Sequence, residues 1–274
     1  MKHYLKLVHF EIIRFRYILL ALMALTAVLE IGSVIYYTND ALTIRAVDTS
    51  YIRNDYELIS FSFILANGQF WFKLSMLISI IIIGVYIFVI WYRDWFGRST
   101  FIYRLLMLPT ARFHIYLAKA TAILTFIFSL LSFQIILFWI QKLIFNSIVP
   151  SHIIKPSYFS EHFMTIRFFL TILPHQFEQF IISYGLGTII MLTIFTAILL
   201  ERSFRKIGLL YAASYIAICS VIILLPHVIA AFDDEIISLF YPNELFVIQL
   251  FCCVIVLLAN VSIGHYLINR KITV

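Results

Sequence analysis

Glu30 is the residue whose surroundings most strongly suggest chemistry, because it is the one acid inside a long apolar run, residues 17–39. An ionised carboxylate is costly to bury among apolar groups, so Glu30 must face protein or water and find a partner or a proton. Lys73 is a candidate partner for it. Three interpretations of Glu30 stay open: a structural polar contact, a role in a substrate path or gate, or a position close to the outer membrane interface.

The other chemistry-bearing residues show no catalytic spacing. The chain has no HExxH zinc pair, no GxSxG nucleophile turn, no GxxxxGK[ST] phosphate loop and no paired carboxylates within an apolar run. Its eight histidines have no ligand spacing, and its three cysteines lie in apolar runs. We therefore predict no catalytic, cofactor-binding or metal-binding residue on this chain. Gln134, Gln249 and Asn260 also lie in apolar runs, where we expect their amides to hydrogen-bond across helices.

The composition indicates whether these residues are surrounded by water or by lipid. Of the 274 residues, 63% are apolar and 12% are charged, against roughly 45–50% and 25% in soluble domains. A water-soluble globule is therefore excluded. A helix needs about 20 apolar residues to cross the hydrocarbon layer of a membrane, and the chain has six runs of about that length or longer. We predict an all-α polytopic membrane protein, a single domain over residues 1–274, with transmembrane helices at 17–39, 70–91, 117–141, 177–200, 207–230 and 245–268.

The basic residues predict the orientation of these six helices. An even number of spans puts both termini on one side, and that side carries 14 of the 20 Lys and Arg residues but only three acids, Glu11, Asp94 and Glu201. Because basic residues are enriched in cytoplasmic loops, we predict that both termini are cytoplasmic. The positive charge is then explained by topology and by anionic lipid headgroups, so we expect no nucleic-acid partner.

Two segments on the predicted cytoplasmic side have amphipathic patterns. In residues 1–16 the apolar residues Leu5, Val8, Ile12 and Phe15 share one helical face, which predicts a helix lying in the headgroup region before the chain turns into the first span. Between spans two and three, a second short helix is predicted at 97–109. Gly97 allows a turn before it, Ser99 or Thr100 can cap it, and Pro109 ends it.

The helix at 97–109 has two interpretations on spacing alone. Phe101, Leu105 and Leu108 fall on one face, while Arg98 and Arg104 point elsewhere. The segment is either an ordinary amphipathic loop anchored to the headgroups or a wedge that enters a groove on a cytoplasmic partner.

A family resemblance bears on the choice between these two interpretations of residues 97–109. The order of an N-terminal interfacial helix, six spans with both ends inside, and the pattern G-x-S-T…L-L-M-L-P-x-x-R…K between spans two and three resembles the permease subunits of type-2 ATP-binding-cassette (ABC) exporters. It is similar in particular to the half-size permeases of bacitracin-resistance, lantibiotic-immunity and peptide-export systems. In that family the segment is a coupling helix that plugs into a separate ATPase. The resemblance implies that the coupling contact includes Gly97, Thr100, Phe101, Tyr103, Arg104, Leu105 and Leu106, followed by Pro109, Arg112 and Lys119 at the return to the membrane. The stretch from Glu11 to Arg16 is implied to lie near the same interface.

The resemblance also implies the function and the partners. The chain would be a transport subunit, not an enzyme, that pairs with an ABC ATP-binding subunit and with a second permease protomer, identical or related. ATP and magnesium would bind to the ATPase, and the complex would export an amphipathic or hydrophobic substrate, such as a peptide, an antibiotic or a lipid-like molecule, across a bacterial cytoplasmic membrane. The alternatives are an intramembrane enzyme and a non-transporting membrane sensor or immunity scaffold.

Overall fold

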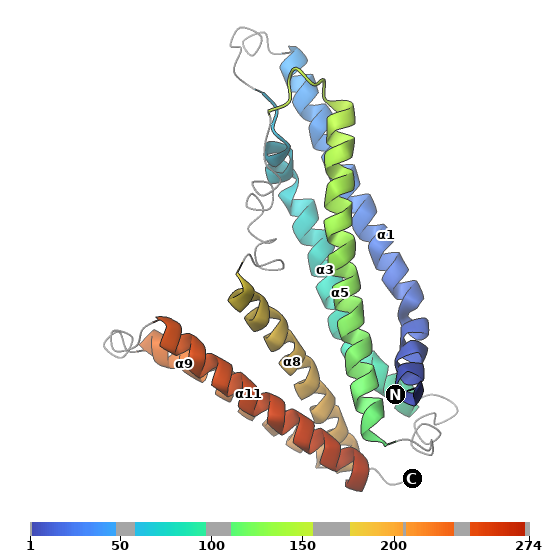
Figure 1. The fold of residues 1–274 in the computed structure, drawn as a ribbon, viewed down its shortest axis with the longest axis vertical. Helices are drawn as coiled ribbons and strands as arrows, with labels where there is room; N and C mark the ends of the chain where they lie inside the picture. The colour runs from blue at the N-terminus through green and yellow to red at the C-terminus, as the bar shows by residue number, and fades with distance from the viewer. Residues whose placement is uncertain are drawn as a thin grey trace. The chain divides into compact units, whose positions relative to one another are not determined.

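The computed structural model describes residues 2–47, 58–96, 111–155, 176–204, 207–232 and 242–271. These contain six helices long and apolar enough to cross a membrane, as predicted (Figure 1). They are α1 (Lys2–Val47), α3 (Phe61–Phe96), α5 (Phe113–Ile148), α8 (Phe177–Ser203), α9 (Gly208–Phe232) and α11 (Pro242–Tyr266), and α11 continues into the π-helix η1 (Leu267–Lys271). The described part has no β-strand, only an isolated bridge between Ile59 and Ile154. The prediction of an all-α, multi-pass membrane protein is confirmed, whereas the cytoplasmic placement of the termini stays a prediction.

The first three helices are longer than the predicted spans. α1 has 46 residues, about 69 Å at 1.5 Å per residue, and it runs unbroken through residue 16, where the sequence predicted a turn from interfacial to spanning helix. The placement of its first turns among lipid headgroups stays a prediction. A charged side chain interrupts the apolar pattern but not the backbone hydrogen bonds of the helix, so a helix can continue beyond the apolar run from which a span is predicted.

The chain divides into two compact units, and α1, α3 and α5 contribute to both. Unit 1 consists of Met1–Ile12, Gly84–Leu124 and Gln176–Val274. Within it α8, α9 and α11 pack against one another (Figure 1), around a core that includes Ile189, Cys219 and Val256. Unit 2 consists of Ile13–Ile83 and Thr125–His175, so its helices are the remaining parts of α1, α3 and α5.

Polar side chains join the helices of unit 1 inside its apolar surroundings. The Asn260 Nδ2 of α11 donates to Thr193 Oγ1 of α8 at 3.0 Å, and the Tyr215 hydroxyl of α9 donates to Asn260 Oδ1 at 2.8 Å. Gln249 Nε2 of α11 donates to the Ile223 carbonyl of α9 at 3.2 Å. Because lipid offers no hydrogen-bond partners, such contacts fix which helix faces meet. The expected cross-helix bonds of Gln249 and Asn260 are confirmed.

The core of unit 2 is built from aromatic and branched side chains of α1, α3 and α5. The Phe61 ring of α3 packs against Phe138 and Phe145 of α5, with centroid separations of 5.6 and 5.4 Å. Val34 of α1 is buried in the same cluster. Offset and edge-on aromatic pairs of this kind add to the energy of simple area burial, and they hold the three helices close enough for polar side chains between them to meet.

Candidate functional site

The predicted coupling segment lies mostly outside the described residues. Gly97, Thr100, Phe101, Tyr103, Arg104, Leu105, Leu106 and Pro109 all fall in residues 97–110, which the structure does not describe. Arg112 is described, and its carbonyl accepts the backbone N–H of Ile115 at 3.1 Å at the start of α5. The candidate site is therefore built from the two helix ends that flank this segment: the end of α3, which closes at Phe96, and the beginning of α5 at Phe113.

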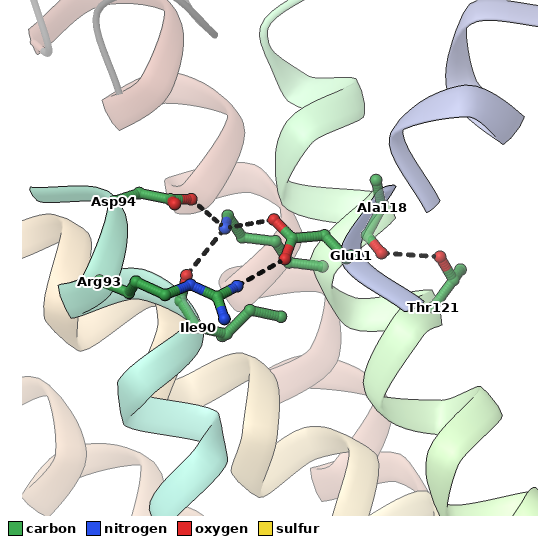
Figure 2. Close-up of polar contacts among 7 residues, drawn as sticks. Glu11, Ile90, Arg93, Asp94, Ala118 and Thr121 are labelled. Atoms are coloured by element: carbon green, nitrogen blue, oxygen red, sulfur yellow. Dashed lines mark hydrogen bonds and ion pairs between the residues drawn. The ribbon is translucent and has the colours of Figure 1, made fainter. Parts of the chain in front are cut away.

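A buried lysine joins these two helix ends to α1 (Figure 2). The Lys119 Nζ of α5 donates to Glu11 Oε1 of α1 at 2.9 Å, to the Ile90 carbonyl of α3 at 2.8 Å, and to Asp94 Oδ2 of α3. The Arg93 guanidinium donates to the other Glu11 oxygen, Oε2, at 3.1 Å. We call Glu11, Ile90, Arg93, Asp94 and Lys119 the Lys119 cluster. All five residues belong to unit 1.

Helix geometry brings these groups together. Ile90 and Asp94 are four residues apart on α3 and therefore share one face, so a backbone carbonyl and a carboxylate point at the same ammonium. An ammonium has three N–H donors and no acceptor, and Lys119 has three acceptors. The side chain of Lys119 is 1% exposed and that of Asp94 is not exposed at all. Lys119 is thus fully bonded and enclosed, which suits a joint between helices and not a reactive amine.

The charges of the Lys119 cluster balance. Its two cations, Lys119 and Arg93, meet two carboxylates, Glu11 and Asp94. Burial of an ion pair is tolerated when partners and hydrogen bonds offset the lost hydration, but removal of one partner leaves an uncompensated charge, at a cost of about 3–5 kcal/mol. The Nζ of Lys119 also lies 5.3 Å from the centroid of the Trp91 ring, a cation–π distance. The cluster therefore resists separation of α1, α3 and α5 at this end.

A neutral contact holds the beginning of α1 to α5 in the same unit. The Tyr4 hydroxyl donates to Thr121 Oγ1 at 3.1 Å, and Thr121 Oγ1 donates in turn to the Ala118 carbonyl at 3.0 Å, as Figure 2 shows for the second bond. Ala118 and Thr121 flank Lys119 along α5. The early turns of α1 are thus attached to α5 by two kinds of contact, one ionic and one neutral.

Sequence reasoning placed Lys119 at the return to the membrane but did not foresee its burial or its partners. The signal that could have found them is the scarcity of acids on a strongly basic side. Each of the three acids there is paired: Glu11 and Asp94 with Lys119, and Glu201 with the Tyr92 hydroxyl and with Arg202, whose Nη2 lies 3.7 Å from Glu201 Oε1. A rare acid among many bases is a good candidate for a structural ion pair.

Glu30 lies in unit 2 and has partners of a different kind. Its side chain is buried, and its carboxyl group accepts hydrogen bonds from Ser75 Oγ of α3 at 2.7 Å and from the amides of Gln134 and Gln141 of α5 at 2.7 and 2.9 Å. We call these four residues the Glu30 cluster. The expected cross-helix bond of Gln134 is thereby confirmed, with Glu30 as its acceptor.

Lys73 does not join the Glu30 cluster. It is exposed, and the described residues contain no ion pair between it and Glu30. The reason is angular: Lys73 and Ser75 are two residues apart on α3, about 200° around a helix of 3.6 residues per turn. The face that carries Ser75 toward Glu30 therefore turns Lys73 away. The sequence-predicted partner is replaced by three neutral donors, two of them from α5.

Comparison with known proteins gives no information about the function of this chain. No family model, no curated protein and no solved structure matches the chain. Residues within the described ranges also form no group of three or more His, Cys, Asp and Glu side chains placed to hold a metal ion. The polar geometry of the two clusters and the six apolar helices are therefore the observations from which a function can be argued.

Proposed function

We propose that this chain is the membrane-spanning subunit of an ABC exporter, acting as a dimer with itself or with a related chain and driven by a separate ATP-binding subunit. Its cargo would be an amphipathic or hydrophobic molecule, such as a peptide, an antibiotic or a lipid-like compound, and its location a bacterial cytoplasmic membrane. ATP and magnesium would be held by the ATPase. The cargo class rests on the aromatic-rich, charge-poor composition, 17% aromatic and 12% charged.

The observation that carries the proposal is the Lys119 cluster. Asp94 lies three residues before Gly97 and Lys119 lies seven residues after Arg112, so the cluster ties together the two ends of the segment from which the family resemblance derives a coupling helix. Glu11 adds α1 to the same joint. A force applied to residues 97–112 would therefore act on α1, α3 and α5 together.

This arrangement suits energy transfer from a partner protein. A coupling segment has to move several spanning helices as a group, and that requires a connection stronger than the surface contacts of a loop. Exposed ion pairs contribute only about 0–1 kcal/mol, whereas breaking a buried pair costs several times more. The burial of Lys119 and Asp94 supports a connection of the stronger kind. The ordinary amphipathic loop would need no such joint.

The test uses charge reversal and apolar-to-acid substitution within the segment. The chain is co-expressed with a candidate ABC ATP-binding subunit from the same organism, and Arg104→Glu and Leu105→Asp are compared with wild type for co-purification and for stimulation of ATP hydrolysis. We expect both variants to lose co-purification at least tenfold and to lose the stimulation. Leu105→Asp would bury an acid on the apolar face that docks, and Arg104→Glu reverses a charge that the resemblance places in the same contact.

Lys155→Glu is the matched control. Lys155 is exposed, lies on the side predicted to be outside, and its reversal changes the net charge by the same amount as Arg104→Glu. It should leave ATPase binding unchanged. If the two segment variants fold, bind and stimulate like wild type, the coupling role is wrong and the intramembrane enzyme and the non-transporting scaffold become the better interpretations.

A further inference from the structure

We propose that Glu30 is a proton-binding site within unit 2, where the carboxyl group takes up and releases one proton and the Ser75 hydroxyl turns to match either state. The proposal goes beyond transport driven by an ATPase and does not depend on it. It rests on the hydrogen-bond geometry of the Glu30 cluster and on the absence of a cation from the described residues around it.

The first observation is that Ser75 has two acceptors but one hydrogen to donate. Its Oγ lies 2.7 Å from Glu30 Oε1 and 2.9 Å from the carbonyl oxygen of Phe72 on its own helix. A hydroxyl group carries one donor and can also accept. Both separations are within the normal range for O–H···O bonds, so the oxygen positions are compatible with two different placements of the hydrogen atoms.

The two placements differ by one proton. With an ionised Glu30, Ser75 donates its hydrogen to Oε1. With a protonated Glu30, the new Oε1–H donates to Ser75 Oγ, and the serine hydrogen turns to the Phe72 carbonyl. In both states Oε2 keeps the two amide N–H bonds from Gln134 and Gln141. The proton is exchanged with water, no heavy atom has to move, and both the serine hydrogen and the acid hydrogen have an acceptor in the state in which they donate.

The second observation is that no charged group among the described residues balances Glu30. Ser75 and Phe72 face it from α3, and Gln134 and Gln141 from α5. Of the charged residues nearest to these in sequence, Lys73 is exposed and Lys142 is partly exposed, and within the described ranges neither is ion-paired with Glu30. A lone ionised carboxylate in such a place is costly, and a proton removes that cost.

The same geometry selects a proton over a metal cation. A sodium or potassium ion would need room and a shell of oxygen ligands, but Gln134 and Gln141 present N–H groups to the carboxylate, and these repel a cation. Glu30, Ser75 and Gln141 are 0% exposed. A proton adds almost no volume, whereas a metal ion would add itself and its shell of ligands.

A third feature indicates where Glu30 exchanges its proton with water. The Oε1 atom of Gln141 is buried and receives no hydrogen bond from the part of the chain that the structure describes, although Nε2 of the same amide donates to Glu30. An unsatisfied buried acceptor is uncommon and calls for a reason. A water molecule that brings or removes the proton would find an acceptor at this oxygen, next to the carboxyl group.

The test is infrared difference spectroscopy on the intact protein in lipid nanodiscs. Acidic-minus-alkaline spectra are recorded in the region of the C=O stretch of protonated carboxylic acids, which is separate from the bands of ionised carboxylates. The chain has 14 Asp and Glu residues, so we expect one component band that wild type gains on acidification and Glu30→Gln lacks, while the bands of the other acids remain. Glu178→Gln, the same substitution at an exposed glutamate, is the matched control and should keep that component.

Ser75→Ala provides a second measurement that retains Glu30. The acid then loses its acceptor, so we expect the band to remain and to move to higher frequency, as for a carboxylic acid without a hydrogen bond. Should Glu30→Gln fail to fold, this shift decides the matter. Spectra of folded Glu30→Gln that lack no component of the wild-type spectra, a component that Ser75→Ala does not move, or the lack of any pH-dependent band in wild type would overturn the proposal. None of these outcomes depends on an ATPase, so they leave the transport proposal to its own test.

Discussion

The Lys119 cluster and the Glu30 cluster are built by the same three helices, α1, α3 and α5, but they accommodate a buried glutamate of α1 in different ways. In unit 1, Glu11 meets two cations, Lys119 and Arg93. In unit 2, Glu30 meets a hydroxyl and two amides. Both carboxyl groups have their hydrogen bonds satisfied, and only one of them has its charge balanced.

The difference separates two roles for buried polar residues. A carboxylate balanced by a bonded cation is held in one state, because removing either charge leaves the other uncompensated. A carboxyl group surrounded by neutral donors can change its charge while its neighbours stay in place. We therefore expect substitutions in the Lys119 cluster to affect mainly stability, and those in the Glu30 cluster to affect mainly protonation.

The largest effect is expected for Lys119→Met. The substitution leaves Glu11 and Asp94 buried without their shared cation, so the free energy of unfolding should fall by about 3–5 kcal/mol. Unfolding of the purified protein in mixed detergent micelles, followed by circular dichroism, measures the change. The double variant with Lys119→Met and Asp94→Asn removes the stranded charge of Asp94, keeps the Glu11–Arg93 pair and should recover more than half of the loss. A double variant that is less stable than Lys119→Met would contradict the ionic explanation.

An intermediate effect is expected when the same substitution is made at the two glutamates of α1. Glu11→Gln should lower the free energy of unfolding by about 2 kcal/mol, because it weakens hydrogen bonds from two charged donors. Glu30→Gln should lower it by less than about 1 kcal/mol, since an amide can still accept from its neutral neighbours. The two variants are compared in the same detergent titration. Equal losses at both positions would remove the distinction between the clusters.

The smallest effect is expected for Tyr116→Phe in unit 1. The Tyr116 hydroxyl lies 3.3 Å from both the Leu192 carbonyl and Thr196 Oγ1, at the long end of hydrogen-bond distances. Its loss should cost about 0.5–1 kcal/mol, below Glu11→Gln and far below Lys119→Met. Thermal unfolding in detergent resolves the order of the three. A loss for Tyr116→Phe as large as that for Lys119→Met would mean that unit 1 is sensitive at every polar site, whatever its charge.

Much of the fold was predictable because a chain inside the hydrocarbon layer has to pair its backbone polar groups with one another. Apolar runs of membrane-crossing length have to be helical, and the six predicted spans correspond to the six membrane-length helices of the structure. The ends of the helices were less predictable. α1 continues past Asn39 to Val47 and α3 begins at Phe61, well before residue 70, because polar residues near a membrane surface are compatible with helix as well as with loop.

The sites were predictable only in part. The position of Glu30 within an apolar run was enough to single it out as a residue that needs partners, and Lys119 was noticed as a basic residue near a helix start. Their actual neighbours come from distant parts of the chain: Gln134 and Gln141 are more than 100 residues from Glu30, and Glu11 is 108 residues from Lys119. No local pattern encodes such a pairing.

The amino-acid sequence by itself determined the six apolar helices of membrane-crossing length that the described residues form, because hydrophobicity and length act locally along the chain. Tertiary structure alone decided which buried glutamate receives a cation and which receives neutral donors. The physical reason is that packing within each unit sets which face of a helix meets its neighbours. Lys119 therefore faces Glu11, whereas Lys73, on the other side of α3 from Ser75, turns away from Glu30.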